Sequence, residues 1–224
     1  MPLAVRDEVR PTISSLAEAK AFNAAATRVR KILPIHVKVD TGMGRLGVPV
    51  RDAAELFRQI RRLRGVRLEG LYTHFCSVED DAAFSRRQAV QFQKLVAELE
   101  AKDLKPALIH ANNSGALLHE PDTRFNLVRP GLLVYGVLPP GQRQSTSCLG
   151  LEVRPALAWK CRVSLIKSIP KGTALSYGRT FIAPRKMRVA TLTAGYGDGY
   201  MRAGSNRAEV LIGGRRCRIV GRIT

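Results

Sequence analysis

Short strand-like runs alternate with helix-like segments along the first 135 residues, and this alternation limits the fold more than any other feature. The expected helices cover Leu16–Arg30, Asp52–Arg64, Phe84–Leu99 and a short segment near Asn112. The expected strands cover Ile35–Val39, Val66–Thr73, Ala107–His110, Phe125–Val128 and Leu132–Tyr135. Strands that alternate with helices form a parallel sheet with crossover helices, so the pattern predicts either a doubly wound sheet or a (β/α) barrel.

The pattern changes after Pro139, where a Pro-Pro-Gly turn and a polar stretch indicate a linker. The β-prone runs that follow are Leu157–Ile166, Arg188–Leu192, Glu209–Ile212 and Arg216–Ile223. We therefore expect two domains, residues 1–144 and residues 145–224, the second rich in β-strand. The first supplies only four or five βα units, whereas a complete barrel has eight, so a barrel here would be a partial one.

Composition excludes several classes of protein. No run approaches the roughly 20 apolar residues that a membrane-spanning helix needs, and charges interrupt the first thirty residues, which lack the apolar core of a secretory signal. These features predict a cytoplasmic protein with no membrane segment. The cysteines form no C-x-x-C pair, which predicts free thiols and no metal site; they are Cys76, Cys148, Cys161 and Cys217.

The net charge of +19 could indicate a nucleic-acid partner. The basic residues are spread along the whole chain, however, and aromatic residues, on which single-stranded nucleic acids stack, make up only 6%. We therefore expect no nucleic-acid partner. The alternative, a basic nucleic-acid binder, would show binding that falls steeply with salt.

The segment Gly42–Gly47 matches the G-x-G-x-x-G pattern of dinucleotide-binding loops. Its context differs, because Pro49 follows the loop and the helical pattern begins only near Asp52. Nicotinamide binding is therefore the weaker interpretation. The same loop brings Lys38, Asp40 and Arg45 together at the carboxyl end of a strand, where α/β proteins bind ligands.

Polar groups also follow the next strands, in the runs Tyr72–His74, His110–Gly115 and Val128–Leu132. Their succession at strand ends predicts one active face. Asn113 to Gly115 would suit a phosphate cradle or, equally, a helix N-cap. In the second half, the glycines that flank Tyr177 and Tyr196 favour a site over a core position.

Taken together, these motifs resemble the pyridoxal-phosphate-dependent alanine racemases. The matching blocks are His36–Gly47, Thr73–Phe75, Asn113–Ser114, Val128–Gly131 with Tyr135–Gly136, Ser176–Gly178, Gly195–Tyr200 and Ile219–Arg222. The resemblance implies an N-terminal (β/α)8 TIM-type barrel that holds pyridoxal 5'-phosphate, a mostly β C-terminal domain and a head-to-tail homodimer with shared sites. It implies interconversion of L-alanine and D-alanine for peptidoglycan precursors, through an aldimine of the cofactor and two-base proton transfer.

The resemblance also implies roles for individual residues. Tyr177 would be the catalytic base on one face of the substrate, supplied across the dimer. Arg45 would bind the substrate carboxylate, and Lys38, carbamylated in many members, would orient Arg45. Arg129 would face the pyridine nitrogen and leave it unprotonated, which favours proton return over transamination. His74 would lie against the cofactor.

The remaining roles concern the cofactor phosphate and the entrance of the site. By resemblance, Asn113, Ser114, Gly131 and Leu132 would bind the cofactor at its phosphate. Tyr196 would line the substrate entrance.

Two departures from the family pattern affect the expected activity. No block like K-A-N-A-Y-G-H-G, which carries the Schiff-base lysine, is present, and none of the ten lysines stands in an equivalent context. The chain also ends just before an expected Met-Asp pair. We therefore expect an internal fragment that is inactive alone, with an opened barrel and exposed strand edges. A broad-specificity or serine racemase and a non-catalytic cofactor-binding or amino-acid-binding remnant stay open as alternatives.

Overall fold

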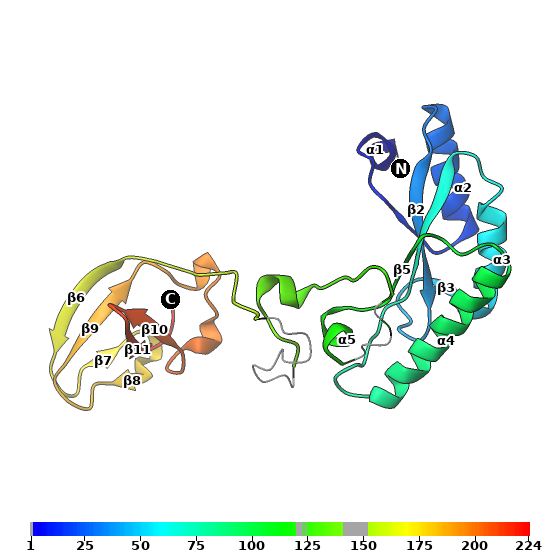
Figure 1. Ribbon diagram of the computed structural model, residues 1–224. Coiled ribbons are helices and arrows are strands. Elements are labelled where there is room, and N and C mark those ends of the chain that lie inside the picture. Colours follow the sequence, from blue (N-terminus) through cyan, green and yellow to red (C-terminus); the bar gives the residue numbers. More distant parts are fainter. Residues whose placement is uncertain (1, 120–122, 124, 141–151) are drawn as a thin grey trace. The chain divides into compact units, whose positions relative to one another are not determined.

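The computed structural model describes residues 2–119, 123, 125–140 and 152–224 (Figure 1). Contacts divide the chain into two compact units, residues 1–157 and residues 158–224. Each unit is described by itself. The domain boundary predicted near residue 145 lies outside the described residues.

The first unit is built on a parallel sheet. Its strands are β1 (Thr12–Ile13), β2 (Leu33–Asp40), β3 (Val48–Pro49), β4 (Val66–Tyr72) and β5 (Leu108–His110). Their order is β1-β2-β4-β5, with β3 paired to β2, and every described pairing is parallel. The helices are α1 (Pro2–Arg6), α2 (Leu16–Arg28), α3 (Val50–Ile60), α4 (Ala82–Ala101) and α5 (Ser114–His119).

The long helices α2, α3 and α4 line one side of this sheet (Figure 1). A doubly wound sheet carries helices on both faces, whereas a barrel carries them only outside. The arrangement is therefore that of a partial (β/α) barrel. Apolar side chains fill the space between helices and strands; the fully buried ones include Ile35, Val37, Phe57, Leu71 and Phe92. Each stabilises the fold by roughly 1.5–3 kcal/mol.

Local sequence explains where the helices begin. Ser15 caps α2 in a capping box, since its hydroxyl accepts from the Glu18 N–H at 3.3 Å while the Glu18 carboxylate accepts from the Ser15 N–H. Asp81 caps α4 by accepting from the Phe84 N–H at 2.8 Å. These caps set where the two helices begin.

A bulge in β4 breaks the alternation of its side chains. Ile35 of β2 pairs with Leu68, but the next residue, His36, pairs with Gly70, so Glu69 is an extra residue. Leu68 and Leu71 both pack in the core on the helix side. Glu69 and Gly70 therefore both lie on the opposite face.

That opposite face of the sheet is polar. His36 and Lys38 of β2 lie there with Tyr72 of β4 and His110 of β5, because paired residues of neighbouring strands share a face. We call these four residues, with Glu69, the polar face. It meets the carboxyl ends of the strands, where the candidate site lies.

The segment after β5 differs from the prediction. Leu132–Tyr135, expected to be extended, is the 3-10 helix η2, and of the expected run Phe125–Val128 only Leu127 forms a β-bridge, to His110. Apolar composition favoured a strand there. The turn closes instead through the Val134 N–H to Gly131 carbonyl bond, and Gly136 ends it with a φ of +72°.

The second unit consists of antiparallel pairs: β6 (Val163–Ile169) with β9 (Met187–Leu192), β7 (Ala174–Leu175) with β8 (Phe181–Ile182), and β10 (Glu209–Ile212) with β11 (Arg215–Arg218). It also contains the 3-10 turns η3 (Tyr177–Arg179), η4 (Tyr196–Asp198) and η5 (Arg202–Gly204). The first predicted run begins as a strand only at Val163, and the last ends at Arg218. The β-rich character is as expected. Its buried apolar residues are Ile169, Ala183 and Ile223, so this unit has little core of its own.

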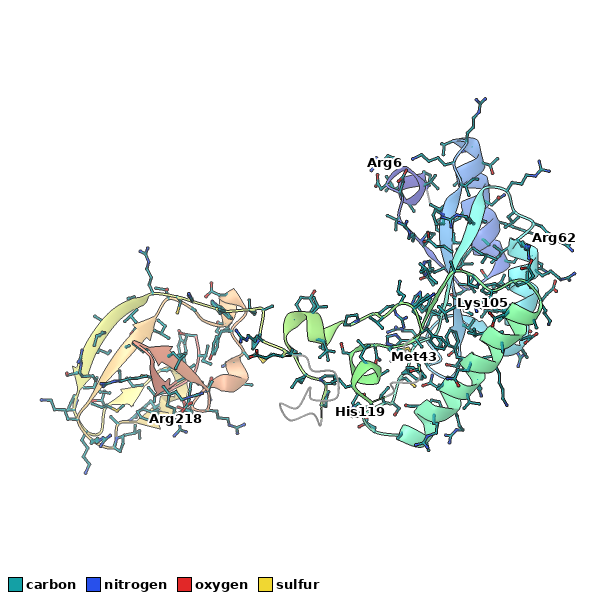
Figure 2. All side chains as sticks on the ribbon, in the orientation of Figure 1. Arg6, Met43, Arg62, Lys105, His119 and Arg218 are labelled. Carbon is teal, nitrogen blue, oxygen red and sulfur yellow. The ribbon has the colours of Figure 1, made fainter. Side chains whose placement is uncertain are left out.

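Exposed basic side chains occur on both units, as Arg6, Arg62, Lys105 and Arg218 illustrate (Figure 2). Across the described residues, no helix combines the length and apolar character needed to cross a membrane.

Candidate active site

Asp40, at the end of β2, shapes the loop that follows it. Its carboxylate accepts from the backbone N–H groups of Gly42 and Met43, both at 2.9 Å, and of Gly44, at 3.0 Å and 3.1 Å. Burial alone would raise the pKa of Asp40, but these N–H groups and Lys38 outweigh burial, so the pKa is lowered. The carboxylate stays ionised and holds the loop closed.

Arg45 lies in this loop and is exposed. The loop then folds back tightly on β2 at Gly47, whose φ is +120° and where a Cβ would lie 2.9 Å from the Asp40 nitrogen. It continues as β3, which pairs with β2, before α3 begins. The glycines therefore serve a strand-to-strand return rather than the start of a helix, and the dinucleotide interpretation fails.

Lys38 is buried beneath the same loop. Its Nζ donates to the Leu46 carbonyl at 2.9 Å, next to Arg45 in the chain. Burial and the positive charges of Arg45 and Arg129 lower the pKa of Lys38. Lys38 is therefore bonded to the loop that carries Arg45, at the carboxyl end of β2.

Arg129 is tied to the ends of two strands, β4 and β5. Its Nη2 donates to the Thr73 carbonyl at 2.7 Å, to the Ala111 carbonyl at 3.0 Å and toward His74 Nδ1 at 3.3 Å. Its Nη1 bonds to His110 Nδ1, and its guanidinium lies 4.8 Å from the Tyr72 ring centre. Burial lowers the pKa of Arg129 to about 10, so the group remains charged at neutral pH.

His74 is held beside Arg129 at the end of β4. Burial and the charge of Arg129 lower the pKa of His74 to about 4, so its imidazole is neutral at neutral pH. The backbone around it is fixed by Gln88 of α4, whose Nε2 donates to the His74 carbonyl at 3.3 Å and to the Thr41 hydroxyl at 3.1 Å.

Gln88 was not among the residues predicted to shape the site. It is buried on the face of α4 that also carries Phe92, Leu95 and Leu99. A polar residue at the helical spacing of an apolar face is the signal that could have identified it, because such a side chain must find partners inside.

The predicted phosphate-binding residues meet at one place. Asn113 caps α5, since its Oδ1 accepts from the Ala116 N–H at 3.0 Å, and its Nδ2 donates to the Phe75 carbonyl at 3.1 Å. The buried Ser114 hydroxyl accepts from the Leu133 N–H at 3.2 Å. This bond joins α5 to the turn at Gly131 and Leu132, which is exposed, and a Cβ at Gly131 would meet open space. Asn113 is therefore a cap, and the turn beside Ser114 has room for an anion.

The sequence also did not identify the partners of Arg129 on the polar face. The sequence places His110 in a strand-end run, and His36 in a predicted strand and a matching block, without joining either to Arg129. In the structure His110 connects Arg129 to His36 and Glu69.

In the second unit, Tyr177 and Tyr196 lie in turns that are tied to the same short segment. The Ser176 hydroxyl donates to the Arg222 carbonyl at 2.6 Å, and the Tyr196 N–H donates to the Thr224 carbonyl at 3.1 Å. Both tyrosine side chains are exposed, at 71% and 59%.

The structure thus brings most of the predicted site residues of the first unit together at the ends of its strands. The charges of Arg45, Arg129 and the Asp40 carboxylate all act on Lys38 there. A positively charged cluster favours a ligand that carries carboxylate or phosphate groups.

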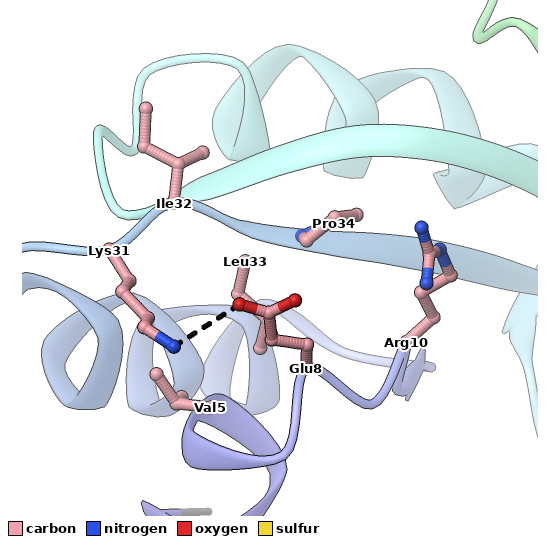
Figure 3. Close-up of a pocket in the computed structure, with 7 residues that line it drawn as sticks. All are labelled: Val5, Glu8, Arg10, Lys31, Ile32, Leu33 and Pro34. Atoms are coloured by element: carbon pink, nitrogen blue, oxygen red, sulfur yellow. Dashed lines mark hydrogen bonds and ion pairs between the residues drawn. The ribbon is translucent and has the colours of Figure 1, made fainter.

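A separate small pocket lies near the start of β2, away from this cluster (Figure 3). Its lining residues are Val5, Glu8, Arg10, Lys31, Ile32, Leu33 and Pro34, and Lys31 pairs with Glu8 at 3.2 Å. None of the predicted site residues is among them.

Comparison with known proteins identifies the family. Residues 1–139 match the alanine racemase N-terminal domain, and residues 156–224 match the alanine racemase C-terminal domain. The alanine racemase of Chlorobaculum tepidum is 42% identical over 216 residues, which are 96% of this chain and 55% of that protein.

Comparison with solved structures identifies the same family. Alanine racemase of Clostridium difficile 630 superposes with a TM-score of 0.87 at 29% identity, covering 100% of this chain and 58% of that one. Alanine racemase of Bacillus anthracis, solved with bound L-Ala-P, gives a TM-score of 0.82 at 29% identity, covering 99% and 57%. The chain spans a little more than half the length of these relatives, and both of its units match in the family's order. The chain therefore belongs to the alanine racemase family.

Proposed function

We propose that this chain carries part of the active site of an alanine racemase, an isomerase that interconverts L-alanine and D-alanine in the cytoplasm for peptidoglycan precursors. The observation that supports this most directly is the position of Arg129, held by carbonyls of two strand ends and by His74, near Lys38 and Arg45. Because the chain spans about 55% of its relative, the complete activity requires more than these residues.

The donor set of the site fits pyridoxal 5'-phosphate. Ser114, with the turn at Gly131 and Leu132, would hold the phosphate. Arg129 would face the pyridine nitrogen: within the described residues its hydrogen bonds come from Nη1 and Nη2, which leaves Nε–H for a ligand. When bound, this cofactor delocalises the electron pair that remains after removal of the α-proton.

Arg45 would bind the substrate carboxylate through its guanidinium, and Lys38 would fix the loop that carries Arg45. Neutral His74 would lie against the cofactor and accept a hydrogen bond from Arg129. Tyr196 would line the entrance.

Tyr177 would take or return the α-proton at its phenol oxygen, on one face of the substrate. Its exposure is consistent with supply to a neighbouring chain in a homodimer with shared sites. Racemisation also needs a base on the opposite face. No lysine here stands in the context of the family's second base, and Lys38 is bonded to Leu46.

Lys38 is suited to carbamylation. A lowered pKa increases the neutral amine, which adds CO₂ to form a carbamate and releases one proton. The resulting anion would be stabilised by the positive charges of Arg45 and Arg129, which act on Lys38. Mass spectrometry in bicarbonate buffer should detect one added carboxyl group on Lys38, and the group should be absent from Lys38→Arg.

The test uses the chain purified from a host that lacks alanine racemase. We expect saturable binding of pyridoxal 5'-phosphate, weaker binding of pyridoxal, which lacks the phosphate, and no racemisation of alanine. Absence of cofactor binding would contradict the proposed site, and turnover by the chain alone would contradict the missing second base.

The same assay separates two alternatives. Production of D-serine by a longer protein that contains this chain would favour a broad-specificity or serine racemase. Cofactor binding without turnover in that longer protein would favour a non-catalytic remnant.

A further inference from the structure

We propose that His110 and His36 form a directional relay from Arg129 to Glu69, which we call the histidine relay, and that His110 is a positioning residue that acts through Arg129. The inference rests on the proposed function only in assigning Arg129 to the cofactor's pyridine nitrogen.

The relay is a continuous chain of contacts. Arg129 Nη1 bonds to His110 Nδ1, His110 Nε2 lies 2.8 Å from His36 Nδ1, and His36 Nε2 lies 3.4 Å from Glu69 Oε2. The carboxylate of Glu69 accepts in turn from Arg10 at 2.7 Å and from Arg67 at 3.3 Å. A cation therefore stands at one end and an ion-paired carboxylate at the other.

The chemistry of the two ends fixes where each proton lies. Arginine only donates, so His110 Nδ1 must accept and the proton of His110 must lie on Nε2. That proton is donated to His36 Nδ1, so the proton of His36 lies on Nε2 and is donated to Glu69. In its neutral form each imidazole is therefore held in one tautomer.

Protonation of either imidazole would break this order. A second proton on His110 would oppose an N–H of Arg129, and a second proton on His36 would oppose the N–H of His110. The charged and titratable groups that face the pair are Arg129, Tyr72 and Glu69, with Arg10 and Arg67 behind Glu69. In agreement, burial together with the charge of Arg129 lowers the pKa of His110 to about 3.

The sheet is built to permit the relay. His36 lies on β2 and His110 on β5, with β4 between them. At Gly70 of β4 a Cβ would lie 2.4 Å from His36 Nδ1, so only a glycine leaves room for the imidazole to reach across. The bulge of β4 turns Glu69 to the same face, and Tyr72 stacks on His110 at 4.7 Å between ring centres.

The relay fixes the orientation of the Arg129 guanidinium. His110 is 3% exposed and cannot turn toward water, so its acceptor nitrogen fixes the Nη1 edge of Arg129. The carbonyls of Thr73 and Ala111 fix Nη2. Among the described residues Nε–H has no protein partner, and the bonds of Nη1 and Nη2 fix the direction in which it points.

Nitrogen-15 NMR of the 224-residue chain tests the relay without cofactor. We expect His110 to show a protonated Nε2 and an unprotonated Nδ1, unchanged from pH 8 to pH 5. Glu69→Gln should increase the other tautomer of His36, while the matched control Glu55→Gln, which alters a surface pair with Arg58, should leave both histidines unchanged. A proton on His110 Nδ1 within this pH range, or identical spectra for the two variants, would overturn the proposal.

Cofactor affinity tests the positioning role. Glutamine at position 110 offers both an acceptor for Arg129 and a donor for His36, whereas leucine offers neither. We expect His110→Leu to weaken binding of pyridoxal 5'-phosphate about tenfold and His110→Gln to restore most of it. Equal affinities for the two variants would refute the role of the acceptor. If the cofactor does not bind at all, the proposed function fails while the NMR result on the relay stands.

Discussion

The polar face of the first unit and the tyrosine turns of the second unit present candidate site residues in opposite ways. Around Arg129, donors and acceptors from β4, β5 and the following segments are paired with one another inside the protein. Tyr177 and Tyr196 are fixed only through their backbone turns, and their side chains are largely exposed. The first region pairs its site residues with one another inside the unit, whereas the second leaves its two tyrosine side chains exposed.

The largest expected effect comes from removing Arg129. Arg129→Ala takes the donor away from the Thr73 and Ala111 carbonyls and from His110, so the free energy of unfolding should fall by roughly 3 kcal/mol or more. Urea denaturation measures it. The control Arg62→Ala, at an exposed arginine, should change stability by less than about 0.5 kcal/mol. Similar losses in both variants would show that the polar face is not an interdependent network.

Acid should weaken the first unit. The pKa values of His74 and His110 in the folded chain, about 4 and about 3, lie below their ordinary value of 6.5. The unfolded chain therefore binds protons below pH 6.5 that the folded chain does not. Stability is full above pH 6.5 and falls as the pH approaches 4, by up to about 1.4 kcal/mol per pH unit for each histidine.

Denaturation at pH values from 7 to 4.5 measures this slope, in a range where Asp40 stays ionised because its pKa is lowered. The double variant His74→Gln/His110→Gln should show a flatter profile. An equally steep profile in that variant would assign the acid sensitivity to other groups.

A matched pair of glycine substitutions compares the two regions directly. Gly70→Ala places a Cβ 2.4 Å from His36 Nδ1 and should cost about 1–3 kcal/mol, whereas Gly197→Ala in the second unit meets nothing within 4 Å. Thermal unfolding of the two variants gives the comparison. A larger loss for Gly197→Ala would show that the backbone around Gly197 is the more tightly packed of the two regions.

The smallest effect on stability is expected at the tyrosines. Tyr177→Phe and Tyr196→Phe remove hydroxyls from exposed side chains, so the free energy of unfolding should change by less than about 0.5 kcal/mol. In a longer, active protein, Tyr177→Phe should nevertheless abolish proton transfer on one face, seen as loss of α-proton exchange from one alanine enantiomer. A large loss of stability would show that Tyr177 is a structural residue.

Periodicity was sufficient to predict the main helices and strands of the first unit, because their apolar faces follow the spacing of the core. It failed at Leu132–Tyr135, where strand-like composition is overridden by a single turn between Gly131 and Gly136. In the second unit strand ends were less well predicted, since few side chains are buried there to define a period.

The site residues were predicted from the order of the sequence motifs. In the first unit, the contacts that connect these residues involve side chains outside the motifs. Glu69 could not have been identified, because its place beside His36 depends on a one-residue register shift between β2 and β4. Gln88 reaches the site from α4, a helix that the motifs do not include. Such contacts depend on how elements pack, which local sequence does not encode.

The bulge at Glu69 has a consequence for how this strand can change during evolution. Loss of the single codon for Glu69 would restore regular alternation, leaving Leu68 and Leu71 on the core side and Gly70 opposite. The apolar packing of the strand would survive while the terminal carboxylate of the histidine relay disappeared. One insertion or deletion event can therefore add or remove this carboxylate in a sheet whose folding determinants stay the same.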